Sequence, residues 1–309
     1  MSVVELKSAE LKQPRSIAMK IFLQIISLAG FCLTTLTVHA DNLKIVAAEN
    51  FYGGVAKQIV EDDATVTSIL TNPNQDPHEF TTNAATAKSV ADADIVIYSG
   101  INYDPWIEKL LATKGNPHRI VIKVSDLIGA REGDNPHIWY DPRTMPAFAT
   151  KLVEELSKND PAQAGTYQKR LDAFKASMKS ELDKIAEIRA ISNGVQVTAT
   201  EPVFGYMAEA LGFKMLNNDF QMKVMNDSEP SADQTAAFEK SLTSKTVRIL
   251  FYNNQVTDPT TDRIQRIAKK SGVPIMGVTE TQPSDQKSYV NWMVHELDEV
   301  QTALGAKNP

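Results

Sequence analysis

Cysteine is nearly absent from this chain of 309 residues, and the single one, Cys32, lies in an apolar segment near the start. The chain after residue 40 therefore has no thiol for a disulfide or for a thiolate metal site. Its stability must come from hydrophobic cores, and 42% of the residues are hydrophobic. Because the chain is longer than an ordinary domain of about 100–200 residues, we expect two domains or one large one.

Clusters of Lys and Arg are also missing. The formal net charge is −6, from 32 basic and 38 acidic residues, and it becomes −8 without residues 1–40, which hold four basic and two acidic residues. An acidic chain without basic patches does not attract nucleic acid or an anionic membrane surface. We therefore expect no nucleic-acid partner.

Long apolar runs are missing except for one, "IFLQIISLAGFCLTTLTVHA" at 21–40. A basic residue before such a run and a small residue at its end, here Ala40, are typical of a secretory signal peptide. Gln24 and several threonines disfavour a membrane anchor. We predict an exported protein whose signal peptide is cleaved near Ala40. Met1 and Met19 both stay open as the start of translation.

Lipid attachment is not expected at Cys32. The residue before it, Phe31, is too bulky for a lipid-attachment site, which requires a small residue at that position. The predicted mature protein is soluble and unlipidated.

Apolar, β-branched segments alternate with helical patterns along the rest of the chain. Strands are predicted at 42–48, 64–70, 94–100 and 119–125, and again at 195–201, 213–218, 247–253 and 274–280. Alternation of strands and helices is typical of βαβ units and a parallel sheet. The sequence therefore predicts an α/β protein of two lobes, each with a parallel sheet.

A long helical stretch separates the two sets of strands. It begins after Asp160 and Pro161, its apolar residues recur every three or four positions, and Asn193 and Gly194 end it. About 31 residues at ~1.5 Å each span on the order of 46 Å, which predicts one long rigid helix. The predicted organisation is a signal peptide at 1–40, an N-terminal lobe at 41–159, a connecting helix at 160–192 and a C-terminal lobe at 193–309.

Histidine is scarce, with five in the chain, yet two of them share one setting. "NQDPHEF" holds His78 and "NPHIWYDP" holds His137, each directly after a proline. Proline fixes its own φ and restricts the residue before it, so both imidazoles leave their loops with little backbone freedom. The other three differ: His39 lies in the signal segment, His118 in a loop expected to be exposed, and His295 within a helix.

Four polar residues follow the carboxyl ends of predicted strands: His78 and His137 in the first lobe, Glu201 and Glu280 in the second. Ligands of open α/β sheets bind in the crevice beyond these strand ends. Singly, a Pro-His pair is more often a surface turn, and Glu201 could be a helix N-terminal charge. Together, two imidazoles and two carboxylates would form a closed cage of net charge −2 for one divalent cation.

The segments "NQDPHEF", "NPHIWYDP", "ATEPVFGYMAEALGF" and "GVTETQP", in this order within residues 42–303, resemble the TroA-like family, the zinc- and manganese-binding periplasmic proteins of ABC importers. The resemblance covers nearly the whole chain after residue 40. It implies two α/β lobes joined by one long helix, and a metal site in the interlobe cleft at His78, His137, Glu201 and Glu280. It also implies a periplasmic protein that delivers a divalent transition-metal ion to a membrane permease.

Two departures from the family pattern bear on the metal. Many zinc-type members have histidine where this chain has Glu201, and a His-rich loop that this chain lacks. The last ligand is commonly aspartate, and because Glu280 is one methylene longer we expect it to contribute least of the four. An oxygen ligand in place of an imidazole favours Mn²⁺ or Fe²⁺, while Zn²⁺ still binds such a set tightly. Zn²⁺, Mn²⁺ and Fe²⁺ therefore stay open as the bound ion.

Two other classes of function stay open from the residues alone. A secreted zinc hydrolase would use two histidines and a glutamate as ligands and leave Glu280 as general base. Against it, no His-Glu-x-x-His segment or nucleophile elbow is found, and a fourth protein ligand would close the open metal position. A cleft for an organic ligand such as a siderophore would have an aromatic rim, for which the candidates are Tyr52, Tyr103, Trp106 and Trp139, but no Arg cluster accompanies them. We predict a monomeric binding protein and no enzyme.

The two histidines also predict how metal binding depends on pH. An imidazole must be neutral to bind a metal, and its ordinary pKa is about 6.5. Below that pH, affinity should fall by up to about tenfold per pH unit for each imidazole, so two of them give a slope approaching two.

Overall fold

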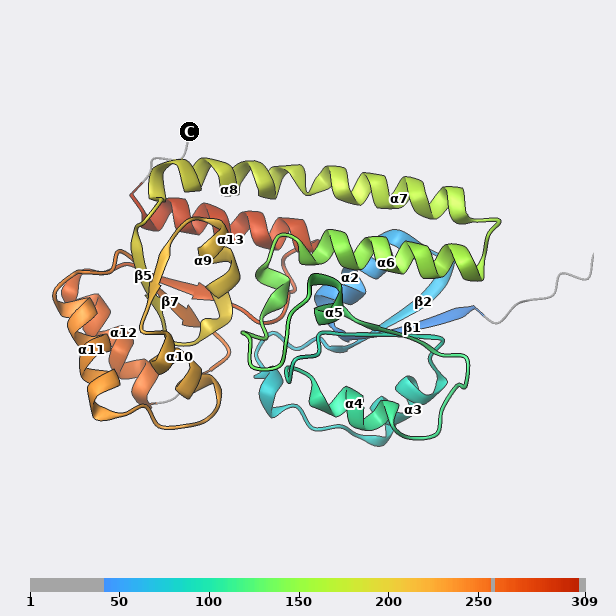
Figure 1. The fold of residues 1–309 in the computed structure, drawn as a ribbon, viewed down its shortest axis with the longest axis horizontal. Helices are drawn as coiled ribbons and strands as arrows, with labels where there is room; N and C mark the ends of the chain where they lie inside the picture. Colours follow the sequence, from blue (N-terminus) through green and yellow to red (C-terminus); the bar gives the residue numbers. More distant parts are fainter. Residues whose placement is uncertain (1–41, 257–258, 306–309) are drawn as a thin grey trace, which may run out of the picture. The chain divides into compact units, whose positions relative to one another are not determined.

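The computed structural model describes residues 42–256 and 259–305. The predicted signal peptide and Cys32 lie outside the described residues. Two four-stranded parallel sheets with helices packed on them confirm the predicted α/β class (Figure 1). Within the described residues, no helix combines the length and the apolar character that crossing a membrane requires.

The first sheet has the strand order β2-β1-β3-β4 and is entirely parallel. Its strands are β1 (Leu43–Glu49), β2 (Ala64–Leu70), β3 (Ile95–Tyr98) and β4 (Ile120–Lys123). Its helices are α2 (Asn50–Val60), α3 (Ala84–Asp92), α4 (Pro105–Leu111), α5 (Val124–Ile128) and α6 (Thr144–Asn159). Alternate residues of β1 and β3 pack with α2 and α6 on one face and with α3 and α4 on the other.

The second sheet repeats this topology, with the order β6-β5-β7-β8. Its strands are β5 (Gln196–Ala199), β6 (Lys214–Leu216), β7 (Leu250–Asn253) and β8 (Ile275–Val278). Its helices are α9 (Gly205–Ala210), α10 (Asn218–Met225), α11 (Ala232–Thr243), α12 (Pro259–Ser271) and α13 (Tyr289–Ala303). The strands of both sheets agree with the predicted strand segments: each strand lies within one of these segments or overlaps it closely.

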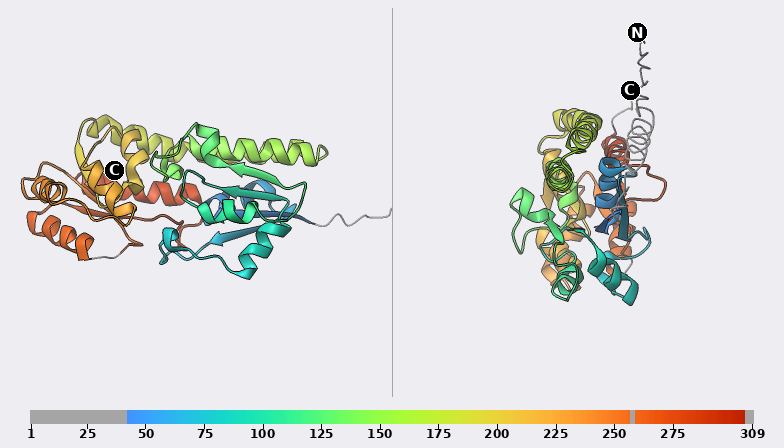
Figure 2. Two further views of the ribbon diagram at one scale, coloured as in Figure 1. Left: turned by 60° about the horizontal axis from the view of Figure 1, so that its bottom comes forward. Right: turned by 90° about the vertical axis from the view of Figure 1, so that its right-hand side faces the viewer.

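The connection between the sheets consists of two consecutive helices, α7 (Ala164–Ser177) and α8 (Lys179–Ser192). Met178 separates them but keeps right-handed dihedral angles, φ −67° and ψ −11°. Figures 1 and 2 show α7 and α8 in line, running past both sheets. The helix starts later than expected, because residues 161–163 form a turn in which Asp160 accepts a hydrogen bond from the N–H of Ala162.

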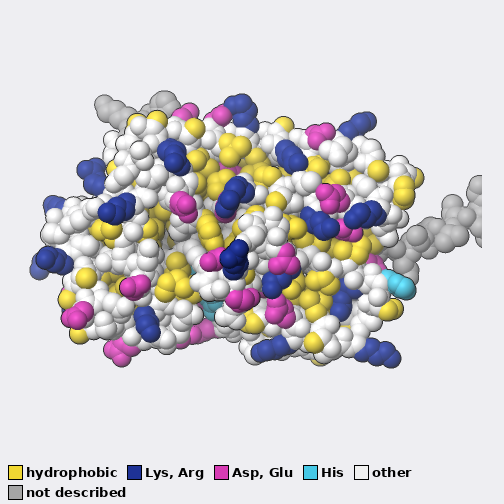
Figure 3. All heavy atoms as spheres, in the orientation of Figure 1, with side chains coloured by type: hydrophobic (Ala, Val, Ile, Leu, Met, Phe, Trp, Pro, Cys, Tyr) yellow, Lys and Arg dark blue, Asp and Glu magenta, His cyan; other side chains and the backbone are white. Residues whose placement is uncertain are grey.

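One hydrophobic core extends without interruption from the first sheet to the second. Helix α13, at the end of the chain, contacts both α8 and α2. Its Trp292 lies 6.0 Å from Phe51 of α2 and 5.6 Å from Tyr140, measured between ring centroids. Helix α13 therefore joins the two lobes, a role that the sequence suggests only for the connecting helix. On the face shown in Figure 3, basic and acidic side chains are interspersed.

Candidate metal centre

The four predicted ligands all lie in segments that follow the carboxyl ends of parallel strands. His78 belongs to η1 (Pro77–Glu79), a one-turn 3-10 helix after β2. His137 and Glu201 directly precede two similar turns, η2 (Ile138–Tyr140) and η3 (Pro202–Phe204). Glu280 follows β8 by two residues. The parallel topology thus brings segments far apart in sequence to one region.

Three of these residues converge on one point. The Nε2 atom of His137 lies 3.2 Å, and that of His78 3.4 Å, from Oε2 of Glu280. The candidate ligand atoms of the three lie within 4.8 Å of one another. His137 and Glu280 are fully buried, whereas the side chain of His78 is 23% exposed. An ion would therefore reach this site from the side of His78.

Asn135 determines which nitrogen of His137 faces the centre. Its Nδ2 donates to the carbonyl of Pro202 at 2.6 Å, so its Oδ1 is an acceptor, and Oδ1 lies 2.7 Å from Nδ1 of His137. Nδ1 must therefore carry the proton. In the neutral ring, Nε2 then presents a lone pair toward Oε2 of Glu280, an arrangement that is favourable only with a metal ion or a proton between the two atoms.

Glu201 lies beside this trio and is linked to it through Asn253. The Nδ2 group of Asn253 donates to Oε2 of Glu201 at 2.6 Å and to Oε1 of Glu280 at 2.7 Å. Glu201 is buried, with 5% exposure, but it does not belong to the tight cluster of three. The structure thus brings three predicted ligands together. Glu201, the fourth, is separated from Glu280 by the amide group of Asn253.

Several residues that support the site were not predicted. Gln255 accepts hydrogen bonds from the N–H groups of Glu280 and Thr281 and donates to the carbonyl of Gln75 at 2.8 Å, so it ties the loop before His78 to the loop of Glu280. Asn253, at the end of β7, satisfies the strand-end rule that located the ligands. Its position at a strand end would have identified Asn253 as a candidate site residue, although an Asn at a strand end is equally common in a turn.

Aromatic rings enclose the two imidazoles. The ring of Tyr103 lies 5.2 Å from that of His78 and 5.9 Å from that of His137, and Trp139 lies 5.3 Å from His137. The hydroxyl of Tyr140 donates to the carbonyl of Thr279, next to Glu280, at 2.8 Å. These side chains exclude water from one side of the centre and hold its loops in place.

The charges of the trio compensate one another. Burial opposes ionisation of Glu280, but its polar contacts with His137 and with the protonated His78 outweigh burial and hold the pKa of Glu280 well below its ordinary value. For His78, burial favours the neutral ring, but the hydrogen bond and charge of Glu280 raise its pKa to about 9. Burial lowers the pKa of His137. Without a metal, the proton on His78 therefore balances the Glu280 carboxylate.

Glu201 differs from Glu280 in its protonation. Burial, with the nearby charge of Glu280, raises the pKa of Glu201 to about 7. At pH 7 and without a cation, Glu280 is ionised and Glu201 about half-ionised, so the two carboxyl groups together hold between one and two negative charges.

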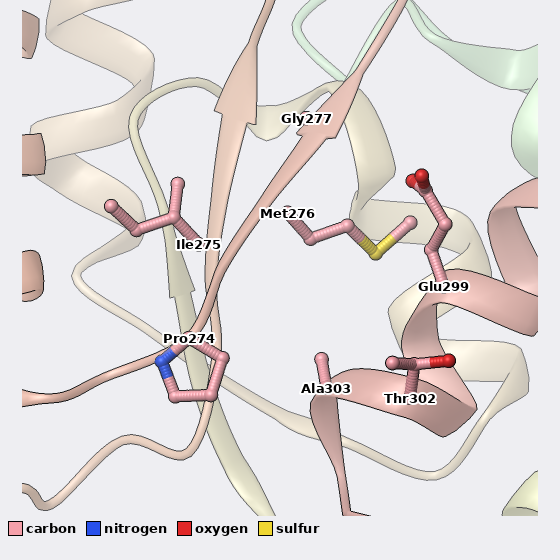
Figure 4. Close-up of a pocket in the computed structure, with 7 residues that line it drawn as sticks. All are labelled: Pro274, Ile275, Met276, Gly277, Glu299, Thr302 and Ala303. Carbon is pink, nitrogen blue, oxygen red and sulfur yellow. The ribbon is translucent and has the colours of Figure 1, made fainter.

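A pocket of about 620 Å³ lies elsewhere, between β8 and the end of α13 (Figure 4). It is lined by Pro274, Ile275, Met276, Gly277, Glu299, Thr302 and Ala303. Glu299 is the one titratable side chain in this lining set, so the pocket offers no cluster of ligands for a metal ion.

The chain matches a known family over most of its length. Residues 45–303 match the family ZnuA, described as zinc-uptake complex component A, periplasmic. The chain is 26% identical over 317 aligned positions to the iron ABC transporter substrate-binding lipoprotein MtsA of Streptococcus pyogenes, covering 94% of this chain and 98% of MtsA. It is 25% identical to the manganese ABC transporter substrate-binding lipoprotein PsaA of Streptococcus pneumoniae, covering 87% of this chain and 91% of PsaA.

Solved structures share the fold. A Mn-bound periplasmic metal-binding protein of Candidatus Liberibacter asiaticus superimposes with a TM-score of 0.69 at 19% identity, over 84% of this chain and 98% of that one. The periplasmic zinc-binding protein TroA of Treponema pallidum gives a TM-score of 0.69 at 21% identity, over 85% and 99%. The predicted TroA-like resemblance is confirmed, and the hydrolase alternative receives no support from these proteins.

Proposed function

The chain belongs to the family of periplasmic zinc-uptake components, and on that basis we propose that it captures a divalent transition-metal ion and delivers it to an ABC importer. The receiving partner is the membrane permease of that importer. The relatives are named for iron and manganese, and TroA for zinc, so Zn²⁺, Mn²⁺ and Fe²⁺ are the candidate cargo ions.

The convergence of two imidazole nitrogens and one carboxylate oxygen carries the proposal. Nε2 of His78 and Nε2 of His137 face Oε2 of Glu280, and the bond from Nδ1 of His137 to Asn135 directs the His137 lone pair at the same point. We assign these three residues as ligands. A bound ion would replace the proton of His78, and Glu201 would complete the set by moving from Asn253 to the metal.

The proposed protein is an exported binding protein without catalytic activity. Its signal peptide would be residues 1–40, cleaved near Ala40. MtsA and PsaA are named lipoproteins, whereas Phe31 before Cys32 predicts that this chain carries no lipid. We further propose that it acts as a monomer and binds no nucleic acid, because its net charge is −6 and no basic cluster occurs in the sequence.

Metal content and thermal stability test the proposed function. The protein beginning at Asp41, dialysed against Zn²⁺, Mn²⁺ or Fe²⁺, should retain one ion per chain. Its melting temperature should rise with free metal, because an ion at 100 times its Kd stabilises the folded state by about 2.7 kcal/mol. His118→Ala, at an exposed histidine, serves as the control and should behave like the wild type. Absence of both retained metal and a melting shift for all three ions would refute metal capture.

A further inference from the structure

The loop Ser99–Asp104, between β3 and α4, has an unusual backbone beside the metal centre. Gly100, Ile101 and Asn102 are three consecutive residues with positive φ, of 81°, 44° and 64°. A β-branched residue such as isoleucine rarely adopts this conformation, and Ile101 is also buried, with 4% exposure. A strained segment persists only where its surroundings fix it. The next residue, Tyr103, contacts the rings of both histidine ligands.

Asp104 fixes this loop from its far end. One carboxylate oxygen accepts a hydrogen bond from the N–H of Ser99 at 2.7 Å, and the other accepts from the N–H of Gly100 at 2.8 Å. The N–H of Tyr103 also donates to the carbonyl of Gly100 at 3.0 Å. Asp104 is buried, with 1% exposure, so water does not compete for these bonds.

Glu49, the last residue of β1, is fully buried, and the adjacent carboxylate of Asp104 raises its pKa in addition to burial. Two ionised carboxylates could not bond to each other, and both oxygens of Glu49 would then have no partner. A proton between the two groups removes this cost. Asp104 accepts from the backbone N–H groups of Ser99 and Gly100, which favour its ionised form, whereas no other described residue's backbone N–H donates to Glu49. The proton therefore belongs on Glu49.

The pKa directions agree with this placement. Burial, with the adjacent charge of Asp104, raises the pKa of Glu49 well above its ordinary value. Burial raises the pKa of Asp104 only to about 6, because its backbone hydrogen bonds oppose the effect.

We propose that Glu49 and Asp104 are positioning residues of the metal centre. They share one proton held on Glu49, and the pair fixes the strained loop that places Tyr103 beside His78 and His137. The inference rests on the proposed function, because it takes the two histidines as metal ligands. Loosening the loop would leave the imidazoles free to turn and would weaken metal binding without removing a ligand.

Two isosteric variants distinguish the members of the pair. Glu49→Gln keeps a donor toward Asp104, so metal affinity should stay within about threefold of the wild type. Asp104→Asn replaces one acceptor oxygen by an NH₂ group that faces a backbone N–H, and it should weaken metal binding by about tenfold or more. Equal losses in both variants would overturn the placement of the proton on Glu49.

A readout on metal-free protein separates this inference from the proposed function. At ring-centroid distances of 5.2 and 5.9 Å, the ring current of Tyr103 should shift the NMR resonances of the His78 and His137 side chains, so Asp104→Asn should move these resonances and Glu49→Gln should leave them in place. If the wild type binds no metal, the proposed function fails, while the resonances still test the loop. If the wild type binds metal, and Asp104→Asn changes neither affinity nor resonances, the inference is wrong.

Infrared spectroscopy covers the case in which Asp104→Asn does not fold. The difference spectrum between the wild type and Glu49→Gln at neutral pH should contain the carbonyl band of a protonated carboxyl group, which the variant loses. A carboxylate band in its place would show that Glu49 is ionised and would overturn the proposal.

Discussion

Glu280 occupies the centre of the site, although its extra methylene suggested that it would contribute least. Both imidazole Nε2 atoms face its Oε2, and Gln255 fixes its backbone N–H. The length of a side chain does not reveal what surrounds it, so this role could not be predicted from the residue type. On this geometry we expect Glu280, which the sequence ranks last, to contribute at least as much as either histidine.

Glu280→Gln should therefore weaken metal binding at least as strongly as His137→Ala, by more than about 100-fold, since the amide removes the charge that balances the ion. Competition against a coloured chelator would measure both affinities. Glu187→Gln, at an exposed glutamate of α8, is the matched control and should bind like the wild type. An effect of Glu280→Gln smaller than that of His137→Ala would restore the order expected from the sequence.

The groups that make metal binding depend on pH are expected to differ from the two histidines of ordinary pKa that the sequence suggests. The pKa of His78 is raised to about 9, so a metal must displace its proton at any pH below that value. Affinity should then rise about tenfold per pH unit up to about pH 9. His137, whose pKa is lowered, adds nothing above about pH 6.5.

Glu201 provides a second proton if it binds the ion. Its pKa is raised to about 7, so between about pH 6 and 7 the slope of log affinity against pH should approach two, and in Glu201→Gln it should be near one. Calorimetric titrations at several pH values would give both slopes. Equal slopes for the wild type and Glu201→Gln would remove Glu201 from the ligand set.

Local chemistry explains which site residues could be predicted. The sequence shows the prolines before His78 and His137. It also shows the predicted strand ends that precede all four candidate ligands. Asn135 acts through Pro202 of the other lobe, and Asn253 through Glu201 and Glu280 of its own lobe, and no local pattern distinguishes such an Asn from one in a turn.

Among the elements, all strands could be predicted because each is a short β-branched run in a buried parallel sheet. The position of α13 between the two lobes could not be predicted. The apolar face of an amphipathic helix shows that the helix is packed, but it does not show which elements it packs against. The strand predicted at 119–125 is wrong at its end, because Val124 and Ser125 belong to the short helix α5, which directly continues β4.

Helix α8 contains a buried acid that should make stability depend on pH. Glu181 has no exposure and both its oxygens lack a partner, and burial raises its pKa to about 8. Because the folded-state pKa exceeds the ordinary 4.5, the stability associated with the neutral carboxyl is complete below about pH 4.5 and is lost as pH rises through 8.

Glu181→Leu should abolish this loss. Between about pH 5 and 8, the free energy of unfolding of the wild type should fall by on the order of 3 kcal/mol more than that of the variant. Urea denaturation at the two pH values measures the difference, with Glu187→Leu on the exposed face of α8 as control. The same pH dependence in the wild type and Glu181→Leu would mean that Glu181 is not buried as described.

On the scale of the whole molecule, the lobes are held together by more than the connecting helices. The core continues between the sheets, the hydroxyl of Tyr289 donates to the carbonyl of Trp139 at 2.8 Å, and Asn50 exchanges two hydrogen bonds with the backbone of Gln282. Opening the lobes would expose this core and break these bonds.

Metal binding should therefore change the arrangement of the lobes little. Small-angle X-ray scattering of the protein beginning at Asp41 should give radii of gyration with and without Zn²⁺ that differ by less than about 1 Å, as in other preorganised complexes. His137→Ala with Zn²⁺ controls for effects of the ion away from the site. A decrease of several ångströms specific to the wild type would instead indicate hinge closure.

X-ray absorption at the zinc edge of the loaded protein most directly tests the claim that His78, His137 and Glu280 hold one ion. Two imidazole rings should appear in the ion's first shell, at the Zn–N distance of about 2.0–2.1 Å, with the remaining ligands oxygen. His137→Ala should reduce the count to one ring, and His118→Ala should leave it at two. A first shell of oxygen alone in the wild type, or two rings retained in His137→Ala, would contradict the assignment.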